Sequence, residues 1–418
     1  MTRNSKGEDS NEISCRFCGH RGLFLFLRLG EMALANRFLS EADLKSADEK
    51  TYPLDVYVCE SCGLVQIGCT VPPDLLFKDY IYFSSTSDAV HKHAEYLAQS
   101  FRERFGLREK SSVVEIASND GCVLQYFKKI GVRTLGVEPA VNIARIASEK
   151  GIETVNEFFN EKTAGVIKTK HGPADVILAR HVFAHVPEIH DFVKGLAHLL
   201  APGGAVAIEA PYLIDFIEKT EFDTVYHEHY SYLSVRPVSK LFSRYGMELF
   251  DVEPAAIHGG SLIYFIGHRG AHPIHSRVSE RARAEVEKGL DKKETYIRFA
   301  KRAEATKGKL RKLLLDLKSQ GKRIAAYGAP AKGNTLLNYC GITTDLVEYT
   351  VDRSPYKQNL YTPGTHLPVR HPDVLVKEMP DYVLLLAWNF ADEILEQQKA
   401  YREKGGRFIV PIPEPKII

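Results

Sequence analysis

The sequence lacks both a long apolar run and a marked excess of charge. No stretch reaches the roughly 18 consecutive apolar residues of a membrane-spanning helix, and the polar residues 1–14 do not resemble a secretion signal. Lys and Arg number 55 against 53 Asp and Glu, which offers no general attraction to nucleic acid or to an anionic membrane. We therefore expect a cytoplasmic protein that binds neither, with reduced cysteines. We expect a monomer or a weak dimer.

Four of the seven cysteines form two Cys-x-x-Cys pairs, Cys15/Cys18 and Cys59/Cys62, each followed by glycine. Four thiolates at this spacing can reach one tetrahedral ion, and in a reducing compartment zinc is favoured over two disulfides. Iron or unligated thiols are the alternatives. A site with four cysteine ligands has no open position for a substrate. The predicted zinc ion therefore stabilises a small domain that has little core of its own.

A buried parallel strand is predicted at 113–117, followed by a polar loop that ends at Gly121 and by a helix. Gly121 permits the tight turn that brings backbone amides close to a ligand. The next strand ends at Glu138, where a carboxylate can accept the hydroxyls of a ribose. The loop lacks the third glycine of the dinucleotide fingerprint, and it looks like the S-adenosylmethionine loop of class I methyltransferases. The predicted cofactor-binding residues are Glu115, Ser118, Asn119, Asp120, Gly121 and Glu138.

Further strands are predicted at 174–179 and at 205–210, the second of them after a turn at 202–204. They extend the same doubly wound sheet. His181 and His185 follow the first of these strands, where open α/β sheets place their ligands. Both are candidates for catalytic contacts, with satisfied structural histidines as the alternative.

The run Tyr226-His227-Glu228-His229-Tyr230 concentrates ionisable and phenolic side chains. Alternation in a strand would place His227 and His229 on one face and the other three on the opposite face, so neither face would be apolar. Acid and base groups cost stability when they are buried without partners, so the run indicates a wet functional cleft. A polar loop with satisfied side chains is the alternative. We interpret the run as the proton-handling part of an enzyme.

A second α/β region follows charged helices predicted over 271–320, whose charges we interpret as solvated surface. A buried strand at 323–328 leads into a turn that contains Lys332 and Gly333, with a helix beginning near Asn334. This turn is a candidate diphosphate cradle, and a turn without a ligand is the alternative. Later strands are predicted at 347–352, 382–387 and 408–411. The predicted fold class is α/β with several domains.

Together these motifs resemble those of the sugar C-methyltransferases that act on nucleotide-linked 4-keto-6-deoxyhexoses. The resemblance covers nearly the whole chain, and it is carried by the four cysteines and by residues 32–39, 115–121, 226–232, 258–261 and 328–335. It implies a zinc-binding N-terminal domain at 1–80, a central class I methyltransferase domain with a doubly wound sheet at 81–270, and a helical connection with a C-terminal Rossmann-like domain for the nucleotide sugar at 271–418. Ala117 stands where many methyltransferases have glycine.

The resemblance implies S-adenosyl-L-methionine as methyl donor and a nucleoside diphosphate sugar, expected to be dTDP-linked, as acceptor. A 4-keto group acidifies the hydrogen at C3, and a neutral histidine is suited to remove it near pH 7. We predict His229 as this base, with Glu228 orienting it. Tyr226 and His185 are predicted to bind the keto oxygen, and Tyr80 to close the pocket. Predicted substrate contacts are His258, Gly259, Ser261, Tyr327, Gly328, Lys332, Asn334 and Asp352.

Three other hypotheses are compatible with parts of the sequence. One is a nicotinamide-dependent sugar-nucleotide oxidoreductase or epimerase, although no G-x-G-x-x-G motif is present. Another is a zinc-ribbon binding module without catalytic activity. In the third, His227, His229 and Glu228 are ligands of a further metal ion.

Overall fold

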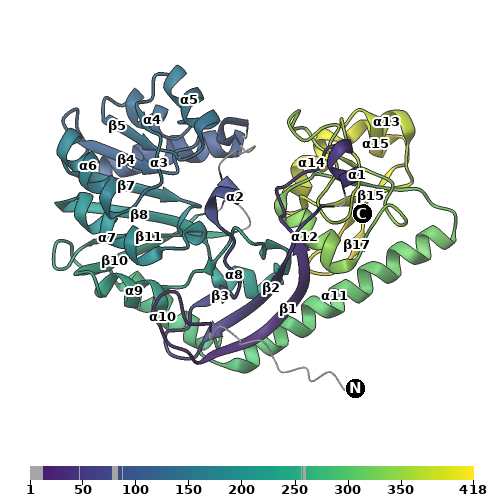
Figure 1. Cartoon of the computed structure of the whole chain (residues 1–418), viewed down its shortest axis with the longest axis horizontal. Helices are drawn as coiled ribbons and strands as arrows, with labels where there is room; N and C mark the ends of the chain where they lie inside the picture. The colour runs from purple at the N-terminus through teal and green to yellow at the C-terminus, as the bar shows by residue number, and fades with distance from the viewer. Residues whose placement is uncertain (1–12, 47, 78–82, 87, 256, 258–259) are drawn as a thin grey trace, which may run out of the picture.

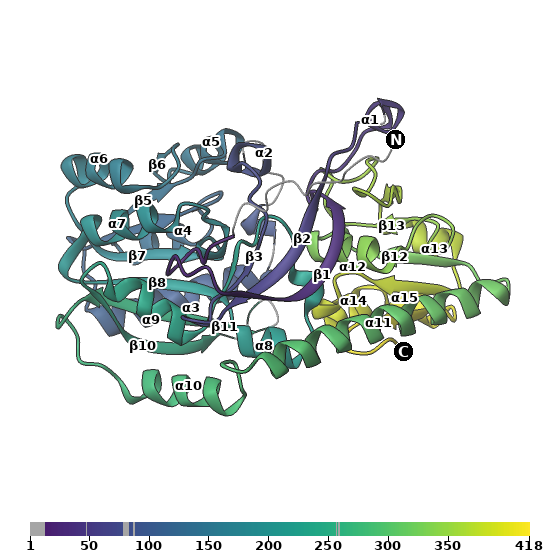
Figure 2. The same cartoon turned by 60° about the horizontal axis from the view of Figure 1, so that its bottom comes forward.

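The computed structural model describes residues 13–46, 48–77, 83–86, 88–255, 257 and 260–418, and three β-sheets organise these residues. A seven-stranded and a six-stranded sheet form two lobes, and a four-stranded N-terminal sheet lies between them (Figures 1 and 2). Predicted positions Tyr80, His258 and Gly259 lie outside the described residues. No helix in the described ranges has the length and apolarity that a membrane span needs.

The N-terminal sheet is antiparallel and brings the two cysteine pairs together. Its strands follow the order β1 (Leu23–Ala33), β2 (Thr51–Cys59), β3 (Val65–Ile67) and β9 (Ser231–Tyr232). The short helices α1 (Glu41–Ser46) and α2 (Pro73–Phe77) belong to the same part of the chain. Strand β9 comes directly after the histidine-rich run, and Val65 of β3 pairs with Tyr232 of β9. The sheet that carries the cysteines therefore also anchors the end of this run.

The central sheet runs in the order β10 (Met247–Ala255), β11 (Ser261–His268), β8 (Leu200–Pro211), β7 (Ala174–Arg180), β4 (Ser112–Ile116), β5 (Arg133–Val137) and β6 (Thr154–Val155). The last five are parallel, and β11 and β10 are antiparallel. Its helices are α3 (Asp88–Phe105), α4 (Leu124–Lys129), α5 (Val141–Glu149), α6 (Glu161–His171), α7 (Ile189–Leu199), α8 (Leu213–Glu218) and α9 (Val235–Ser243). The predicted doubly wound sheet is confirmed.

Helices cover both faces of this sheet because successive side chains of a strand point in opposite directions. Val113 of β4 belongs to a buried cluster with Leu97 of α3 and Phe127 of α4. Its neighbour Val114 belongs to a different cluster, with Leu196 of α7. A strand that is buried on both faces needs an uninterrupted apolar run, which is the pattern at 113–116.

One predicted turn in the central sheet is wrong. Residues 202–204 lie inside β8, which starts at Leu200, and the pairing of β7 with β8 shifts register between Ala174 and Val176. A Cβ atom on Gly204 would lie 2.8 Å from the carbonyl oxygen of Asp175, so glycine permits a close approach of two strands here. The Pro-Gly-Gly sequence therefore forms an irregularity within a strand.

Two helices connect the lobes, as predicted for 271–320: α10 (Ser276–Glu287) and α11 (Lys293–Ser319). Helix α11 extends from the lower edge of the central lobe along the C-terminal lobe (Figures 1 and 2). Its Arg302 Nε donates to Thr220 Oγ1 over 3.0 Å on one side, and its Thr306 hydroxyl donates to the carbonyl oxygen of Pro413 over 3.0 Å on the other. The helix therefore holds both lobes.

The C-terminal sheet has the order β14 (Val369–Arg370), β13 (Thr350–Val351), β12 (Ile324–Tyr327), β15 (Tyr382–Leu385), β16 (Arg407–Val410) and β17 (Lys416–Ile417), parallel except for β17. Its helices are α12 (Ala331–Cys340), α13 (Val374–Glu378), α14 (Ala391–Gln397) and α15 (Lys399–Glu403). The helix predicted near Asn334 begins earlier, at Ala331, because Pro330 supplies an extended N-cap position. The strand predicted at 347–352 is reduced to Thr350–Val351.

Candidate active site

The four cysteine sulfurs lie together at one end of the N-terminal sheet. Every pair of these Sγ atoms is within 4.8 Å, and the Sγ atoms of Cys15 and Cys62 and of Cys18 and Cys59 are each 3.5 Å apart. Four sulfurs around one zinc ion, each with a bond of about 2.3 Å, are separated by about 3.8 Å. The donor set and its geometry therefore fit one tetrahedral zinc ion.

The loop after β4 has a strained backbone. Ala117, Asn119 and Gly121 have φ angles of 53°, 50° and 75°. Positive φ is costly for residues with a Cβ atom and concentrates at ligand sites. A Cβ atom on Gly121 would lie 2.8 Å from Cγ1 of Ile152, so this position requires glycine. Ala117 adopts a conformation that glycine would adopt without strain.

The end of β4 and the loop after it present buried polar atoms that lack a hydrogen-bond partner among the described residues: Glu115 Oε2, Ser118 Oγ and Asp120 Oδ1. Such atoms are rare in folded proteins and are expected where a ligand supplies the missing partner. Burial raises the pKa of Glu115 to about 8, with an opposing effect from Arg180. The other oxygen of Asp120 accepts from Lys150 Nζ over 2.7 Å. The loop therefore fits a polar cofactor such as S-adenosyl-L-methionine.

Glu138 lies at the tip of β5, beside this loop. Its two carboxylate oxygens accept the backbone N–H groups of Asn119 and Ala140, each over 2.9 Å. Burial raises the pKa of Glu138, and these two N–H groups lower it. A carboxylate oxygen can accept more than one hydrogen bond. Backbone N–H groups therefore hold Glu138, the predicted acceptor for ribose hydroxyls, in a fixed orientation, and one of them belongs to the cofactor loop.

The run at 226–230 forms a turn, so the alternation expected for a strand is wrong. Tyr226 and His229 point toward each other, with 2.8 Å between the Tyr226 hydroxyl oxygen and His229 Nε2. His229 Nδ1 lies 2.8 Å from the carbonyl oxygen of Thr224. A carbonyl can only accept, so Nδ1 carries the proton and the neutral ring has its basic lone pair on Nε2. Burial lowers the pKa of His229 to about 4.

His185 lies next to His229 at the carboxyl edge of the central sheet. It ends a short 3-10 helix, η2 (Phe183–His185), after β7, and its ring centroid is 4.8 Å from that of His229. Burial, with the nearby charges of His229 and His181, holds the pKa of His185 well below its usual range. His181 has a φ of 50°, and its Nε2 lies 3.0 Å from Glu209 Oε1. The sheet edge predicted to bind ligands therefore carries a group of histidines.

Glu228 and His227 face the N-terminal sheet, and each is only 2% exposed, so they do not line a wet cleft as expected. Glu228 Oε1 accepts from Asn36 Nδ2 over 2.7 Å, and His227 Nε2 lies 3.2 Å from the carbonyl oxygen of Tyr52. Burial raises the pKa of Glu228 to about 7, opposed by Asn36 and by the charge of Lys357. We predicted that Glu228 orients His229; instead, the Thr224 carbonyl and the Tyr226 hydroxyl hold that ring.

The predicted substrate residues of the C-terminal lobe gather after β12. Gly328 has a φ of 90°, and Asp352 holds the turn by accepting the Ala329 N–H over 2.6 Å. Asn334 is buried and donates to the carbonyl oxygen of Ala35 over 2.6 Å, which joins α12 to the N-terminal segment. Lys332 Nζ lies 4.3 Å from the ring centre of Trp388.

Two other predicted substrate residues have hydrogen-bond partners within the protein. The Tyr327 hydroxyl lies 3.4 Å from Gln397 Oε1, and the Ser261 hydroxyl donates to the carbonyl oxygen of Ile257 over 3.2 Å.

Sequence reasoning did not find four residues that shape the site: Asn36, Thr224, Lys357 and Trp388. Asn36 lies within residues 32–39, which carry part of the family resemblance, so that stretch was the available signal. The other three act through contacts with residues far away in the sequence or through a backbone carbonyl, and no local pattern marks them. His227, Glu228 and His229 do not form a metal-binding group: within the described ranges, only the four cysteines do.

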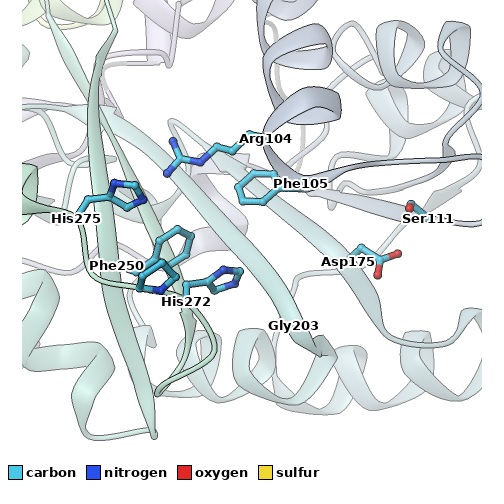
Figure 3. Close-up of a pocket in the computed structure, with 9 residues that line it drawn as sticks. Arg104, Phe105, Ser111, Asp175, Gly203, Phe250, His272 and His275 are labelled. Atoms are coloured by element: carbon cyan, nitrogen blue, oxygen red, sulfur yellow. The ribbon is translucent and has the colours of Figure 1, made fainter.

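A cavity of about 390 Å³ lies at the opposite edge of the central sheet. Asp175 and Gly203, near the amino ends of β7 and β8, line it, and Figure 3 shows His272 stacked on Phe250, with ring centroids 4.2 Å apart. Open α/β sheets bind ligands at the carboxyl ends of their strands. We therefore do not assign this cavity to the active site.

Comparisons with known families match three consecutive parts of the chain. Residues 15–77 match the model of a zinc binding domain, 90–252 a methyltransferase domain, and 256–413 a C-methyltransferase C-terminal domain. The C-methyltransferase NovU of Streptomyces niveus is 38% identical over 405 residues, which cover 97% of this chain and 96% of that protein. These matches give no support to a nicotinamide enzyme or to a binding module without catalytic activity.

Two solved methyltransferase structures each match less than half of the chain. A methyltransferase from Anabaena variabilis ATCC 29413 is 17% identical, covers 41% of this chain and 83% of its own, and has a TM-score of 0.33. One from Clostridium acetobutylicum ATCC 824 is 10% identical, covers 43% and 92%, and has a TM-score of 0.36. These TM-scores are too low to support an inference. By its close relative and its three domain matches, the chain is an S-adenosyl-L-methionine-dependent enzyme with a structural zinc site, and it belongs to the zinc-containing sugar C-methyltransferase family.

Proposed function

We propose that the enzyme methylates C3 of a nucleotide-linked 4-keto-6-deoxyhexose, with dTDP as the expected nucleotide, through an enolate. His229 removes the C3 proton in this proposal. The observation that carries it is the state of the His229 ring: neutral, with Nδ1 bound to the Thr224 carbonyl and the basic lone pair on Nε2. A pKa of about 4 keeps the ring neutral at pH 7, so its Nε2 lone pair is unprotonated there.

Tyr226 has two roles in this mechanism. Its hydroxyl proton is donated to His229 Nε2 in the described arrangement. A hydroxyl has a single proton, so when the 4-keto oxygen accepts the hydrogen bond, Nε2 is released to face the C3 hydrogen. The same hydroxyl then stabilises the negative charge that develops on the oxygen. The base therefore becomes available at the moment when the ketone is polarised.

His185 is proposed as the second group at the keto oxygen. Its ring lies beside that of His229, and it is held at the end of β7, next to the strand that leads into the cofactor loop. Glu228 supports the turn through Asn36. Tyr80 remains a proposal for closing the pocket, because it lies outside the described residues.

The cofactor side of the site consists of Glu115, Ser118, Asn119, Asp120, Gly121 and Glu138. When bound there, S-adenosyl-L-methionine supplies an electrophilic methyl group. Glu138 orients the ribose, and Gly121 permits the positive φ and the close packing against Ile152 that shape the loop. Both the cofactor loop and His185 lie at the carboxyl edge of neighbouring parallel strands, which favours in-line transfer between ligands held close together.

The acceptor is proposed to contact Ser261, Tyr327, Gly328, Lys332, Asn334 and Asp352, together with His258 and Gly259 outside the described residues. Gly328 and Lys332 lie at the turn between β12 and α12, where a parallel sheet binds ligands. We also propose the domain limits 1–80, 81–270 and 271–418, with β9 as a strand that the middle segment contributes to the N-terminal sheet.

The test is solvent exchange at C3. Wild-type enzyme in D2O, with 4-keto sugar nucleotide and without methyl donor, should incorporate deuterium at C3, and His229→Ala should lose both exchange and methylation. His227→Ala is the matched control, because His227 faces Tyr52 in the N-terminal sheet. Continued exchange in His229→Ala would assign the base to another residue.

A further inference from the structure

We infer that Trp388, in the C-terminal lobe, is a positioning residue for His229 and acts through Asp223. The inference rests on the proposed function, in which His229 is the base. Trp388 begins a 3-10 helix, η4 (Trp388–Phe390), after β15, and Asp223 lies in another, η3 (Phe222–Thr224), directly before the histidine-rich turn. The two residues therefore connect the sheet of one lobe with the catalytic turn of the other.

The contact between them is short and partly buried. The indole N–H of Trp388 donates to Asp223 Oδ2 over 2.6 Å, and Asp223 is 0% exposed. Asp223 precedes Thr224, whose carbonyl oxygen receives the Nδ1 proton of His229. The orientation of that carbonyl fixes both the tautomer and the tilt of the imidazole ring. A residue that holds Asp223 in place therefore also helps to hold the Thr224 carbonyl, which accepts the Nδ1 proton of His229.

A second hydrogen bond holds the other side of Thr224. The hydroxyl of Thr335, in α12, donates to the carbonyl oxygen of Val225 over 3.0 Å in a buried contact. Asp223 and Val225 flank Thr224, so both neighbours of the critical carbonyl are bound to the C-terminal lobe. A rotation of the peptide that presents this carbonyl would therefore move groups that are bonded to the C-terminal lobe.

Lys332 connects the same arrangement with the proposed diphosphate turn. Its ammonium lies over the ring of Trp388, 4.3 Å from the ring centre. Burial raises the pKa of Asp223 and lowers that of His229, and the charge of Lys332 acts to lower both. The other oxygen of Asp223 has no hydrogen-bond partner in the described part of the chain. The indole N–H is therefore a principal partner of a buried carboxylate.

The chain contains a single tryptophan, which permits a one-atom test. Growth of a tryptophan auxotroph with benzothienylalanine replaces the indole N–H of Trp388 by sulfur and keeps the shape of the side chain. We expect kcat for C3 exchange and for methylation to fall about tenfold to a hundredfold, as small misplacements of a catalytic group do, while KM for the sugar nucleotide stays nearly constant. Trp388→Phe is the genetic counterpart, and Phe390→Leu, in the same 3-10 helix, is the control.

The imidazole nitrogens of His229 give a readout that does not depend on turnover. In ¹⁵N NMR of the full-length enzyme, wild type should show a protonated Nδ1, and the sulfur analogue should change its shift or populate the other tautomer. An unchanged His229 signal together with wild-type kcat in the analogue would overturn the positioning role. Exchange that continues in His229→Ala would overturn the proposed function instead, and the NMR comparison would still decide whether Trp388 positions the ring.

Discussion

The hydroxyl oxygen of Tyr226 lies 2.8 Å from Nε2 of His229, three residues later in the chain, and the two ring centroids are 4.0 Å apart. Because Nδ1 of His229 is bound to the Thr224 carbonyl, this hydroxyl donates to the nitrogen that we propose as the base. In this turn the Tyr226 hydroxyl therefore occupies Nε2 of His229 until the ketone of a substrate accepts the same hydroxyl proton. The turn is held between η3 on one side and β9, which pairs with β3, on the other, so the two side chains stay in place when they exchange hydrogen-bond partners.

Tyr226→Phe should separate protection of the base from stabilisation of the enolate. The variant exposes Nε2 but removes a donor from the developing oxyanion, and the loss of one such donor typically costs about 100-fold to 1,000-fold in kcat. We expect methylation to fall by this amount while donor binding, measured by calorimetry, is unchanged. The control for this experiment is a tyrosine whose hydroxyl is hydrogen-bonded to the protein away from the proposed site.

Tyr230→Phe is this matched control. The Tyr230 hydroxyl donates to the carbonyl oxygen of Val71 over 2.7 Å, between β3 and α2, and its loss should lower the free energy of unfolding by about 1 kcal/mol without a change in mechanism. Equal losses of kcat in the two variants would show that Tyr226 contributes through stability alone.

The buried state of His229 should make stability depend on pH. Its pKa is about 4 in the folded protein and about 6.5 in the unfolded chain, so between these values the unfolded chain binds more protons. The contribution of His229 to stability is therefore present above pH 6.5 and is lost as the pH falls toward 4, by at most about 1.4 kcal/mol per pH unit.

Glu228 shifts in the opposite direction: its raised pKa of about 7 stabilises the fold at low pH, and this contribution is lost as the pH rises through 7. The measurement is therefore a difference between wild type and His229→Gln, in which the effect of Glu228 cancels. Urea denaturation at pH 7 and pH 5 should show wild type losing stability relative to the variant at pH 5. A constant difference would contradict the neutral, buried ring.

The parts of the fold that the sequence predicts well are those with local causes. The strand at 113–117 needs a continuous apolar run to be buried on both faces, and Gly121 is required by backbone geometry and by contact with Ile152. The four-cysteine cluster could be predicted because the Cys-x-x-Cys spacing of its ligands is visible in the sequence. For the same reason the order of the three regions follows from their motifs.

The contacts that the sequence does not predict are between distant residues. Asn36 reaches Glu228 across 192 positions, and Trp388 reaches Asp223 across 165. An alternating pattern can indicate which side chains share a face only if a strand forms, and at 226–230 the Thr224 carbonyl and the Tyr226 hydroxyl organise a turn instead. The C-terminal lobe therefore contacts Asp223 and Val225, next to the turn that carries the proposed base, and no local pattern contains that information.

Loss of the zinc ion should abolish chemistry while the methyl donor still binds. Cys18→Ser removes one of four ligands, and the N-terminal sheet should lose the pairing of β3 with β9 that anchors the histidine-rich turn. The cofactor loop belongs to a different sheet. We expect metal analysis to show loss of zinc, methylation to fall below detection, and calorimetric binding of S-adenosyl-L-methionine to persist.

Cys69→Ser is the control, because Cys69 is not one of the four clustered cysteines. It should retain one zinc ion per chain and wild-type activity. Retention of zinc with full activity in Cys18→Ser would contradict a structural role for the cluster.

Gly121→Ala should weaken donor binding more than it weakens the fold. The new Cβ atom would lie 2.8 Å from Cγ1 of Ile152 at a φ of 75°, so the cofactor loop must shift. Gly131→Ala carries a similar backbone penalty, of about 1–2 kcal/mol, at a φ of 84°, but its Cβ atom would meet only Cγ of Glu109, at 3.6 Å. We expect the larger loss of stability in Gly121→Ala, because only its Cβ atom collides with a buried side chain. The Kd for S-adenosyl-L-methionine should rise about tenfold or more in Gly121→Ala alone, which corresponds to about 1.4 kcal/mol. Equal Kd values in the two variants would mean that the donor does not depend on the conformation of this loop.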